Sequence, residues 1–569
     1  MEVLNWLAAH APLVFLFAAV ALGYFAGKLK IGNFVLGGIA GTLVVGVILG
    51  QAGVTIDTAI KDIFFALFIY AVGYQGGPQF FRALSLKSLT QLLSAGVMCV
   101  LGLLTVLAFA WGFGLDRGTA AGLAAGGLTQ SAIIGTAGET IQKLTVSADL
   151  KSVMETNIAV GYAVCYIFGS IGPILMITWF FPTIMRWDIR TEAIKLAEKM
   201  SGGAATLEPG QFDAAQRIDT RFYQLQPGTD WIGHPAQEMD VFYKDFAVEA
   251  VLRAGQEIDI DTVTSLQEGD VLALTGMVDA LETTPQDFAR EVPAPASYRL
   301  VLENRHIVLT SPDFADHTLQ DIHDLTQSRA MRDVFLTGVK RMGRDLPLLP
   351  DLELHKGDEL QVTGNPRDLN AVQKAIGYPI SAAAVTDFIF FGIGMTLGLL
   401  LGLIEFRLGG VPVSIGSGGG CLLSGLLFGW LRGTHPRYAA LPTGAVNFLR
   451  DFGLAVFVGV VGISAGPQVL TTLQEQGMSL FLFGIGVTLI PQLIGFFFSY
   501  YVLRIQNPIE ALACVAGGRS ANPGFAALLG KAENATPVVT FTVTYAVANV
   551  LLTLWGPLIV GLVSTNPAP

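Results

Sequence analysis

Long apolar stretches fill both ends of the chain and are missing from its middle. From Leu13 to Phe181, and again from Phe388 to Val563, apolar residues continue with few charges. The segment between Arg186 and Lys374 is an ordinary mixture of charged and apolar residues. Because a helix needs about 20 apolar residues to cross the hydrocarbon core of a bilayer, the pattern predicts two membrane regions that flank a soluble insert.

Each membrane region contains six segments long enough to be considered as membrane helices. The first region has, in order, 11–28, 33–50, 62–80, 87–113, 118–142 and 153–181. The second region has 386–406, 412–431, 446–466, 478–503, 511–533 and 537–563. The fifth segment of each region is too rich in glycine and polar residues for a plain lipid-facing helix, so we expect it to be irregular.

The two membrane regions also share short motifs in the same order. The shared motifs are Gly73–Gln79 with Gly462–Gln468, Ala125–Gly127 with Ala516–Gly518, Tyr162–Val164 with Tyr545–Val547, Gly172-Pro173 with Gly556-Pro557, and the spaced glycines Gly41, Gly46 and Gly50 with Gly420, Gly425 and Gly429. Self-similarity in a fixed order is the signature of internal repetition. The sequence therefore predicts a tandem duplication of one membrane unit.

Lysine and arginine in short loops predict the orientation of the first region, because cytoplasmic loops carry an excess of these residues. Basic residues follow its first, third and last spans: Lys28, Lys30, Arg82, Lys87, Arg186 and Arg190. This distribution places the N-terminus outside the cytoplasm only if 118–142 enters the membrane and returns to the same side. Each region then has five crossings and one re-entrant hairpin.

Five is an odd number, so the second region is predicted to be inverted relative to the first. Its basic loop residues Arg432, Arg437 and Arg504 follow its second and fourth spans, as inversion requires, whereas Arg407 is an exception. We expect a bacterial inner-membrane protein with periplasmic termini and a cytoplasmic insert. The N-terminal segment lacks a basic stretch and a cleavage site, so we expect it to be a retained helix rather than a signal peptide.

Composition supports the membrane assignment. Hydrophobic residues make up 52% of the 569 residues and charged residues only 14%, against about 25% charged in soluble proteins. The net charge of -11 comes largely from the insert, and no basic run suggests a nucleic-acid partner. The four cysteines lie in apolar stretches and form no metal-binding spacing. A P-loop is absent, which disfavours an ATP-driven pump, and no nucleophile–base pair indicates an enzyme.

The irregular segments carry the candidate substrate contacts. Inverted repeats with broken helices are typical of secondary transporters, and the exposed N–H groups at short helix ends favour anions. The candidate contacts are Thr129, Gln130, Ser131, Arg519, Ser520 and Asn522. The residues expected to open the backbone there are Gly126, Gly127, Gly517, Gly518 and Pro523. The alternative is that the polar residues only cap the hairpin tips.

Arg519 is the most informative of these residues. An arginine inside an apolar segment is costly and usually functional, and its planar fork suits a carboxylate. The alternatives are that Arg519 pairs with Glu533 or with backbone carbonyls, or lies near the cytoplasmic interface.

A second pair of candidate sites lies in the two Gly-Pro-Gln motifs. The prolines remove a helix donor and the glycines loosen the turn, so we expect unwound helix at Gly73, Gly77, Pro78, Gly466 and Pro467. The polar contacts expected there are Gln75, Gln79, Ser464 and Gln468. The alternative is a helix kink that serves packing. Four charged residues near helix ends, Glu139, Lys143, Asp387 and Glu405, are expected to be solvated.

The insert contains two similar units. The run Gln267–Gly276 matches His355–Gly364, and in each a Gly-Asp turn precedes a short alternating strand and then a helix. Residues 246–253 and 298–303 are predicted to be strands. The expected divisions are 1–185 and 381–569 for the membrane repeats, 186–215 for a helical connector, and 216–290 and 291–380 for two small α/β domains.

The duplicated motifs and the paired insert units resemble the aspartate:alanine exchanger family, and the units resemble TrkA-C (RCK-C) domains. The resemblance implies exchange of small carboxylates, either aspartate for alanine or a C4-dicarboxylate such as succinate. It also implies an elevator-like motion, a homodimer in the membrane lipid, and a small regulatory ligand at the TrkA-C domains. The spacing of the cysteines and histidines predicts no metal site, and no cofactor is expected. The alternative is an ion channel or cation transporter regulated by TrkA-C domains, although a TVGYG-type filter is absent.

Overall fold

The computed structural model describes most of the chain. The described residues are 6–8, 10–28, 30–31, 34–35, 37–84, 88–200, 218–243, 246–258, 260, 265–294, 301–325, 334–379, 386–408, 411–435 and 438–563. The chain divides into two compact units, one made of Met1–Leu196 with Ala384–Pro569 and the other of Ala197–Ala383. Both membrane regions thus belong to one unit, and the insert forms the other.

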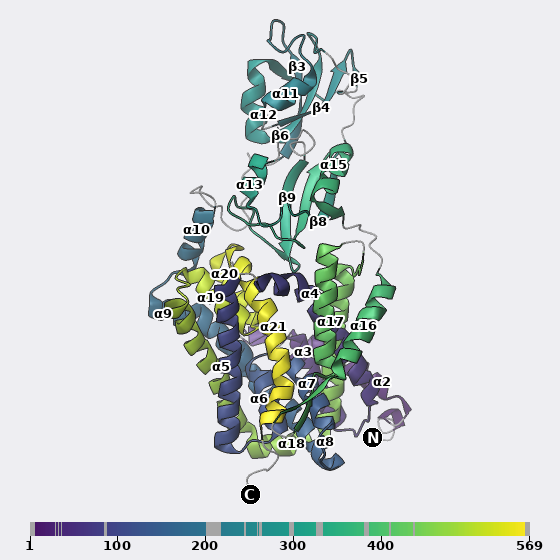
Figure 1. Ribbon diagram of the computed structural model, residues 1–569, viewed down its shortest axis with the longest axis vertical. Helices are drawn as coiled ribbons and strands as arrows, with labels where there is room; N and C mark the ends of the chain where they lie inside the picture. The colour runs from purple at the N-terminus through teal and green to yellow at the C-terminus, as the bar shows by residue number, and fades with distance from the viewer. Residues whose placement is uncertain are drawn as a thin grey trace. The chain divides into compact units, whose positions relative to one another are not determined.

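The membrane unit is helical, and its two halves follow a similar but not identical order of elements (Figure 1). The first half consists of α2 (Pro12–Gly27), the hairpin β1 (Lys30–Ile31) and β2 (Phe34–Val35), α3 (Gly38–Gly50), α4 (Thr58–Ala83), α5 (Leu89–Phe113), α6 (Arg117–Gly127), α7 (Ala132–Gln142), α8 (Ala148–Leu175), the π-helical turn Met176–Phe180 and α9 (Phe181–Met185), with α10 (Ile189–Met200) following. The second half consists of α16 (Phe388–Gly402), the hairpin β13 (Glu405–Leu408) and β14 (Val411–Ser414), α17 (Gly416–Thr434), α18 (Thr443–Phe497), the π-helical turn Phe498–Val502, α19 (Pro508–Gly518), α20 (Asn522–Ala532) and α21 (Thr536–Leu562).

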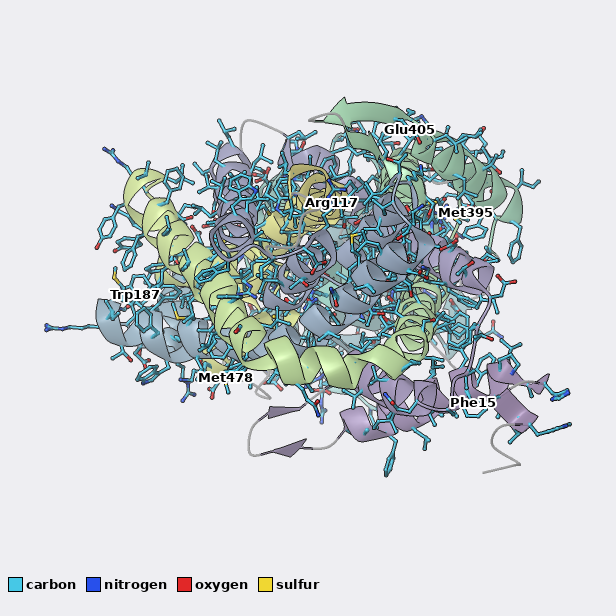
Figure 2. All side chains as sticks on the ribbon, turned by 90° about the horizontal axis from the view of Figure 1, so that it is seen from below. Phe15, Arg117, Trp187, Met395, Glu405 and Met478 are labelled. Atoms are coloured by element: carbon cyan, nitrogen blue, oxygen red, sulfur yellow. The ribbon has the colours of Figure 1, made fainter. Side chains whose placement is uncertain are left out.

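Several predicted spans differ from the observed helices. The segments 446–466 and 478–503 join in one helix of 55 residues, α18, which is about 80 Å long at 1.5 Å per residue. Figure 2 shows that α18 curves strongly. Two stretches here, Thr443–Pro467 and Gly477–Val502, are each apolar and long enough to cross a membrane, and the second includes the π-helical turn that follows α18. The other described helices that meet this condition are α5, α8 with its extension to Met185, and α21, while α2, α3 and α16 are shorter apolar helices.

Helix α5 packs antiparallel against the second part of α18. Helix α5 contacts the π-helical turn after α18 through Ser94 and Ser499, whose hydroxyls are 2.8 Å apart, and α18 itself through Phe109 and Phe483, whose ring centroids are 5.2 Å apart. Contacts thus move backward along α18 as they move forward along α5.

The Gly-Pro-Gln motifs lie within continuous helices, so the predicted unwinding at Gly73, Gly77, Pro78, Gly466 and Pro467 is wrong. The glycines instead permit close helix contacts. A Cβ atom on Gly73 or Gly77 would collide with the backbone of α17 at Leu422 or Leu426. In the other half, a Cβ on Gly466 would come 2.7 Å from the backbone of Gly50 in α3. Small residues at such contacts allow membrane helices to pack closely.

The insert contains two modules with the same sheet topology. The first module has the strand order β5-β4-β6-β3-β7 and the second β10-β9-β11-β8-β12. The first contains β3 (Ile218–Leu225), α11 (Ala236–Phe242), β4 (Phe246–Arg253), β5 (Gln256–Ile258), β6 (Val271–Met277), α12 (Val278–Thr283), the 3₁₀ turn Thr284–Asp287 and β7 (Ala289–Val292). The second contains β8 (Glu303–Leu309), α13 (Leu319–Leu325), β9 (Val334–Arg341), β10 (Arg344–Asp345), β11 (Glu359–Gly364), α15 (Pro366–Ile376) and β12 (Gly377–Pro379). The prediction of two α/β units is confirmed. The strand expected at 298–303 begins at Glu303 instead, and residues 298–300 lie outside the described part.

Each Gly-Asp turn is fixed by an arginine from the neighbouring strand. In the second module, Arg341 donates to both carboxylate oxygens of Asp358 at 2.8 and 2.6 Å. In the first, Arg253 donates to Asp270 at 2.9 and 2.8 Å. The carboxylates are almost completely buried in both modules. Because a buried carboxylate needs such a partner, the matched sequence motifs mark one structural feature present twice.

Candidate functional site

Both irregular segments are helix pairs interrupted by the same backbone turn. The first turn separates α6 from α7, and the second separates α19 from α20. The amide of Gln130 donates to the carbonyl of Ala125 at 2.8 Å, and the amide of Ala521 donates to that of Ala516 at 2.9 Å. This is the Schellman pattern that ends a helix. The two breaks therefore have one design, which the Ala-Gly-Gly motifs mark in the sequence.

The left-handed residue of each turn is not a glycine. Thr129 has a φ of 54° and Ser520 a φ of 57°. A side chain in this region costs about 1–3 kcal/mol and persists where the surroundings hold it in place. The two breaks therefore share the same strained backbone conformation at the same position.

A tyrosine supports the residue after each turn. The hydroxyls of Ser131 and Tyr162 are 2.9 Å apart, and the side-chain amide of Asn522 donates to the hydroxyl of Tyr545 at 3.2 Å. The tyrosines belong to the repeated Tyr-Ala-Val motif. That motif identified the repeat in the sequence, but its role in holding the breaks was not predicted.

Arg519 connects the second break to three other elements. Its guanidinium donates to the carbonyl of Thr488 in α18 at 3.0 Å, to that of Gly169 in α8 at 3.2 Å, and to that of Gly127 at the end of α6. The side chain is 1% exposed. The C-terminus of a helix carries a partial negative charge, so the end of α6 is a favourable place for this cation.

Among the described residues, the hydrogen-bond partners of Arg519 are carbonyls rather than carboxylates. Glu533, the acid expected as an alternative partner, instead pairs with Arg190 at 2.8 Å. The Nε of Arg519 is buried without a hydrogen-bond partner. The expected alternative of backbone carbonyls is therefore what this structure shows, and the guanidinium keeps its charge while its Nε stays without a hydrogen-bond partner.

Asn549 in α21 joins the two breaks from the side. Its side-chain oxygen accepts from Ser520 at 3.0 Å and from Gln130 at 3.4 Å. Gln130 also donates to the hydroxyl of Thr553 at 3.2 Å. The structure thus brings together Thr129, Gln130 and Ser131 of the first break and Arg519 and Ser520 of the second, whereas Asn522 is exposed.

Sequence reasoning missed Asn549 and Thr488. Both are buried polar residues within apolar segments. A polar side chain in a predicted membrane span is expensive and usually faces the protein interior. That signal was present in the sequence, but only the fold shows which neighbours these residues contact.

The polar residues of the Gly-Pro-Gln motifs lie elsewhere. Gln75 accepts a hydrogen bond from Arg450 at 2.8 Å. Gln79 is 2% exposed, and its side-chain oxygen has no partner. Ser464 lines a cavity, and the side chain of Gln468 lies outside the described part. No described hydrogen bond connects this group to the two breaks.

That cavity has a volume of about 890 Å³ and lies among α4, α7, α8, α16, α17 and α18. Its wall contains Lys61 and Glu155, which form an ion pair at 3.2 Å. Glu139 also lines it and accepts hydrogen bonds from the hydroxyl of Ser417 and the amide of Gly418 at the start of α17. Glu139 is therefore a half-buried residue that bonds a helix N-terminus rather than a solvated charge. The cavity reaches α7 one turn beyond the first break.

Both membrane regions match one family of permeases. The family model described as "Predicted Permease Membrane Region" of the Asp-Al_Ex type matches residues 15–182 and 390–561. A TrkA-C domain model matches residues 305–377, which is the second module. The first module has the same topology and lies outside the matched residues. No solved structure matches the chain.

Three relatives match over nearly their full length. An uncharacterized transporter of Francisella tularensis is 49% identical over 98% of both chains. Uncharacterized transporters of Zymomonas mobilis and Bradyrhizobium diazoefficiens are 39% and 34% identical, each over 98% of this chain and 99% of the relative. These names indicate a transporter rather than an enzyme. The chain therefore belongs to the aspartate:alanine exchanger family of permeases and carries a TrkA-C domain within its insert.

Proposed function

We propose that the protein is a secondary exchanger of small carboxylates, either aspartate for alanine or a C4-dicarboxylate. The observation that carries this proposal is the buried charge of Arg519, which has carbonyl partners but no described carboxylate partner. A buried cation is expensive unless an anion compensates it. A substrate carboxylate would supply that anion, and the Nε of Arg519 would donate to it.

The arrangement of the two halves supports alternating access. The antiparallel packing of α5 with α18 is the geometry that inverted repeats produce. Matched helix breaks at the interface of such repeats are where secondary transporters bind substrate. We propose that each broken helix pair is a re-entrant hairpin and that the two move together against the helices that carry the Gly-Pro-Gln motifs, in an elevator-like motion.

Exchange follows from the same charge. When no substrate is bound, moving Arg519 across the membrane would carry an uncompensated charge, which raises the barrier for the empty protein. A bound carboxylate lowers that barrier by neutralising the guanidinium. Transport in one direction then requires a substrate for the return, which is the definition of exchange.

We propose that the cavity near Lys61 is the entry from the periplasm. The positive-inside rule places the N-terminal ends of α4 and α8 on that side, and both contribute to the cavity wall. The same rule places the insert in the cytoplasm and both termini in the periplasm of the bacterial inner membrane.

Counterflow in liposomes tests the proposed function. Purified protein in liposomes preloaded with alanine, aspartate or succinate should accumulate the labelled external substrate, whereas a channel would produce no counterflow. The variant Arg519→Ala should lose this uptake, and Arg519→Lys should retain part of it because the charge remains. Since Arg519 also holds four elements together, each variant must elute as wild type in size-exclusion chromatography. Full uptake by a correctly folded Arg519→Ala protein would refute the role of Arg519.

A further inference from the structure

Three potential metal ligands converge in the second module of the insert. One ligand atom each from Asp316, Glu353 and His355 lies within 4.8 Å of the others. His355 is 6% exposed, Glu353 is half-buried and Asp316 is exposed. We propose that these three residues bind one divalent transition metal ion of the zinc type.

The donor set fits such an ion. Imidazole nitrogen and carboxylate oxygen are both Zn²⁺ ligands, and three protein ligands leave a position for water. Two carboxylates with one neutral imidazole give a charge of about −2, which balances a divalent cation. Ca²⁺ and Mg²⁺ prefer oxygen ligands throughout, so the imidazole favours a transition metal over these ions. The exposed side of Asp316 leaves a path for the ion to enter.

The backbone around the three residues is held in place before any ion binds. The amide of Asp316 donates to the carbonyl of Leu354 at 2.8 Å, which ties the two ligand-bearing loops together. The carbonyl of Glu353 accepts from Arg341 at 2.9 Å, and the amide of His355 donates to Asp358 at 2.8 Å. The buried Arg341–Asp358 pair therefore fixes both neighbouring ligands.

The first module provides an internal comparison. Its loops form the same hydrogen bonds, because the amide of Gly233 donates to the carbonyl of Leu266 at 2.8 Å, as that of Asp316 does to Leu354. The positions that correspond to Asp316, Glu353 and His355 are Gly233, Ser265 and Gln267. None of these has a carboxylate or imidazole group. The shared loop geometry therefore does not itself require the three ligands.

One of the three ligand positions, Asp316, has a backbone conformation that is unfavourable for a residue with a side chain. Gly233 has a φ of 93° and Asp316 a φ of 67°, so both loops need the left-handed region that favours glycine. The first module uses glycine there and the second uses aspartate. The backbone conformation would favour glycine at this position. The aspartate is less favourable there, but its carboxylate can serve as a metal ligand.

The first module also supplies the test variants. The substitutions Asp316→Gly, Glu353→Ser and His355→Gln introduce residues that the same loop already accommodates, so the fold should survive them. His306→Gln is the matched control, because His306 lies in the same module, is partly exposed and pairs with Glu359 at 2.6 Å outside the proposed site.

The measurement is Zn²⁺ binding to the full-length, tag-free protein in detergent, by equilibrium dialysis with atomic absorption. Wild type and His306→Gln should bind one Zn²⁺ per chain at micromolar concentrations, and millimolar Mg²⁺ or Ca²⁺ should not displace it. The triple variant should lose this ion, and each single variant should bind at least about tenfold more weakly, since one ligand is removed. Zn²⁺ should also raise the unfolding temperature of wild type and not that of the triple variant.

Two outcomes would overturn the proposal. Wild-type protein that binds no stoichiometric Zn²⁺ would exclude the site. A triple variant that elutes as wild type and still binds one ion would place the metal elsewhere. Transport activity does not enter either measurement, so the result is independent of the proposed exchange function.

Discussion

Arg519 donates a hydrogen bond to the carbonyl of Gly127, so the helix break of one membrane half is bonded to the helix break of the other. The two residues are separated by 392 positions in the chain. Asn549 adds a second connection, because it accepts hydrogen bonds from both breaks. The two breaks are therefore joined in one hydrogen-bonded polar cluster, and changes near Arg519 should affect both.

A carboxylate introduced beside Arg519 should take the place of the substrate carboxylate. In Thr488→Asp, a carboxylate would lie beside Arg519, because the Thr488 hydroxyl and the Arg519 guanidinium both donate to the carbonyl of Gly127. The guanidinium would then be neutralised without substrate. Hydrogen bonds to charged groups contribute about 1.5–3 kcal/mol, so substrate affinity should fall by roughly 10- to 100-fold.

Binding of labelled substrate to the purified protein measures this loss. Thr488→Asn has nearly the same shape without the charge and should lose much less affinity. Equal losses in the two variants would show that the charge is not the cause.

Removing the shared acceptor should loosen both breaks. Asn549→Ala leaves the Ser520 hydroxyl and part of the Gln130 amide without their buried partner. An unsatisfied buried donor costs about 1–3 kcal/mol, so the unfolding temperature in detergent should fall and exchange should weaken. Thr553→Ser keeps the hydroxyl that accepts from Gln130 and should behave nearly as wild type.

Alanine substitutions at two adjacent glycines of α4 should have opposite effects on stability. Gly77→Ala places a Cβ against the backbone of α17 at Leu426, whereas at Gly76 the nearest atom is a Leu426 methyl group 3.9 Å away. Gly77→Ala should therefore separate the helices and cost at least about 1–3 kcal/mol through overpacking. Gly76→Ala should be neutral or stabilising, because alanine favours a helix by about 1 kcal/mol over glycine. Thermal unfolding in detergent measures both, and similar losses in the two variants would contradict the packing argument.

Removing the arginine of the buried ion pair should destabilise the second module more than the first. Arg341 is 1% exposed, whereas Arg253 is 32% exposed. Arg341→Met leaves Asp358 buried without its partner, and breaking a buried pair costs about 3–5 kcal/mol. In Arg253→Met, water can still reach the place where the guanidinium lay, so the loss of stability should be smaller. Hydrogen exchange of the insert amides in the full-length protein should report this difference, and equal loss of protection would contradict it.

Much of the architecture was predictable because repetition and hydrophobicity are local signals. The membrane–insert–membrane division, the paired irregular segments and the two α/β modules all follow from patterns a few residues to a few tens of residues long. The Gly-Asp turns at Asp270 and Asp358 were predicted in the same way. The role of each aspartate was not, because its partner Arg253 or Arg341 lies 17 residues away on another strand.

The Gly-Pro-Gln motifs show where local reasoning fails. Proline and glycine weaken a helix in isolation, so the sequence predicted unwinding at Pro78 and Pro467. In the folded unit both helices continue, because neighbouring helices pack against the glycines and hold the backbone. The same residue types thus signal a break in one context and a close contact in another.

The sequence by itself determined that this protein is a duplicated membrane permease with a paired soluble insert. The apolar content of each segment and the spacing of its apolar residues are enough to predict which segments are buried. It also identified both helix breaks and the arginine within one of them. Only the tertiary structure decided that Arg519 bonds carbonyls of the other half, that Asn549 joins the breaks, and that Asp316, Glu353 and His355 meet. These contacts join residues distant in the chain, and the packing of whole helices and strands brings them within hydrogen-bonding distance.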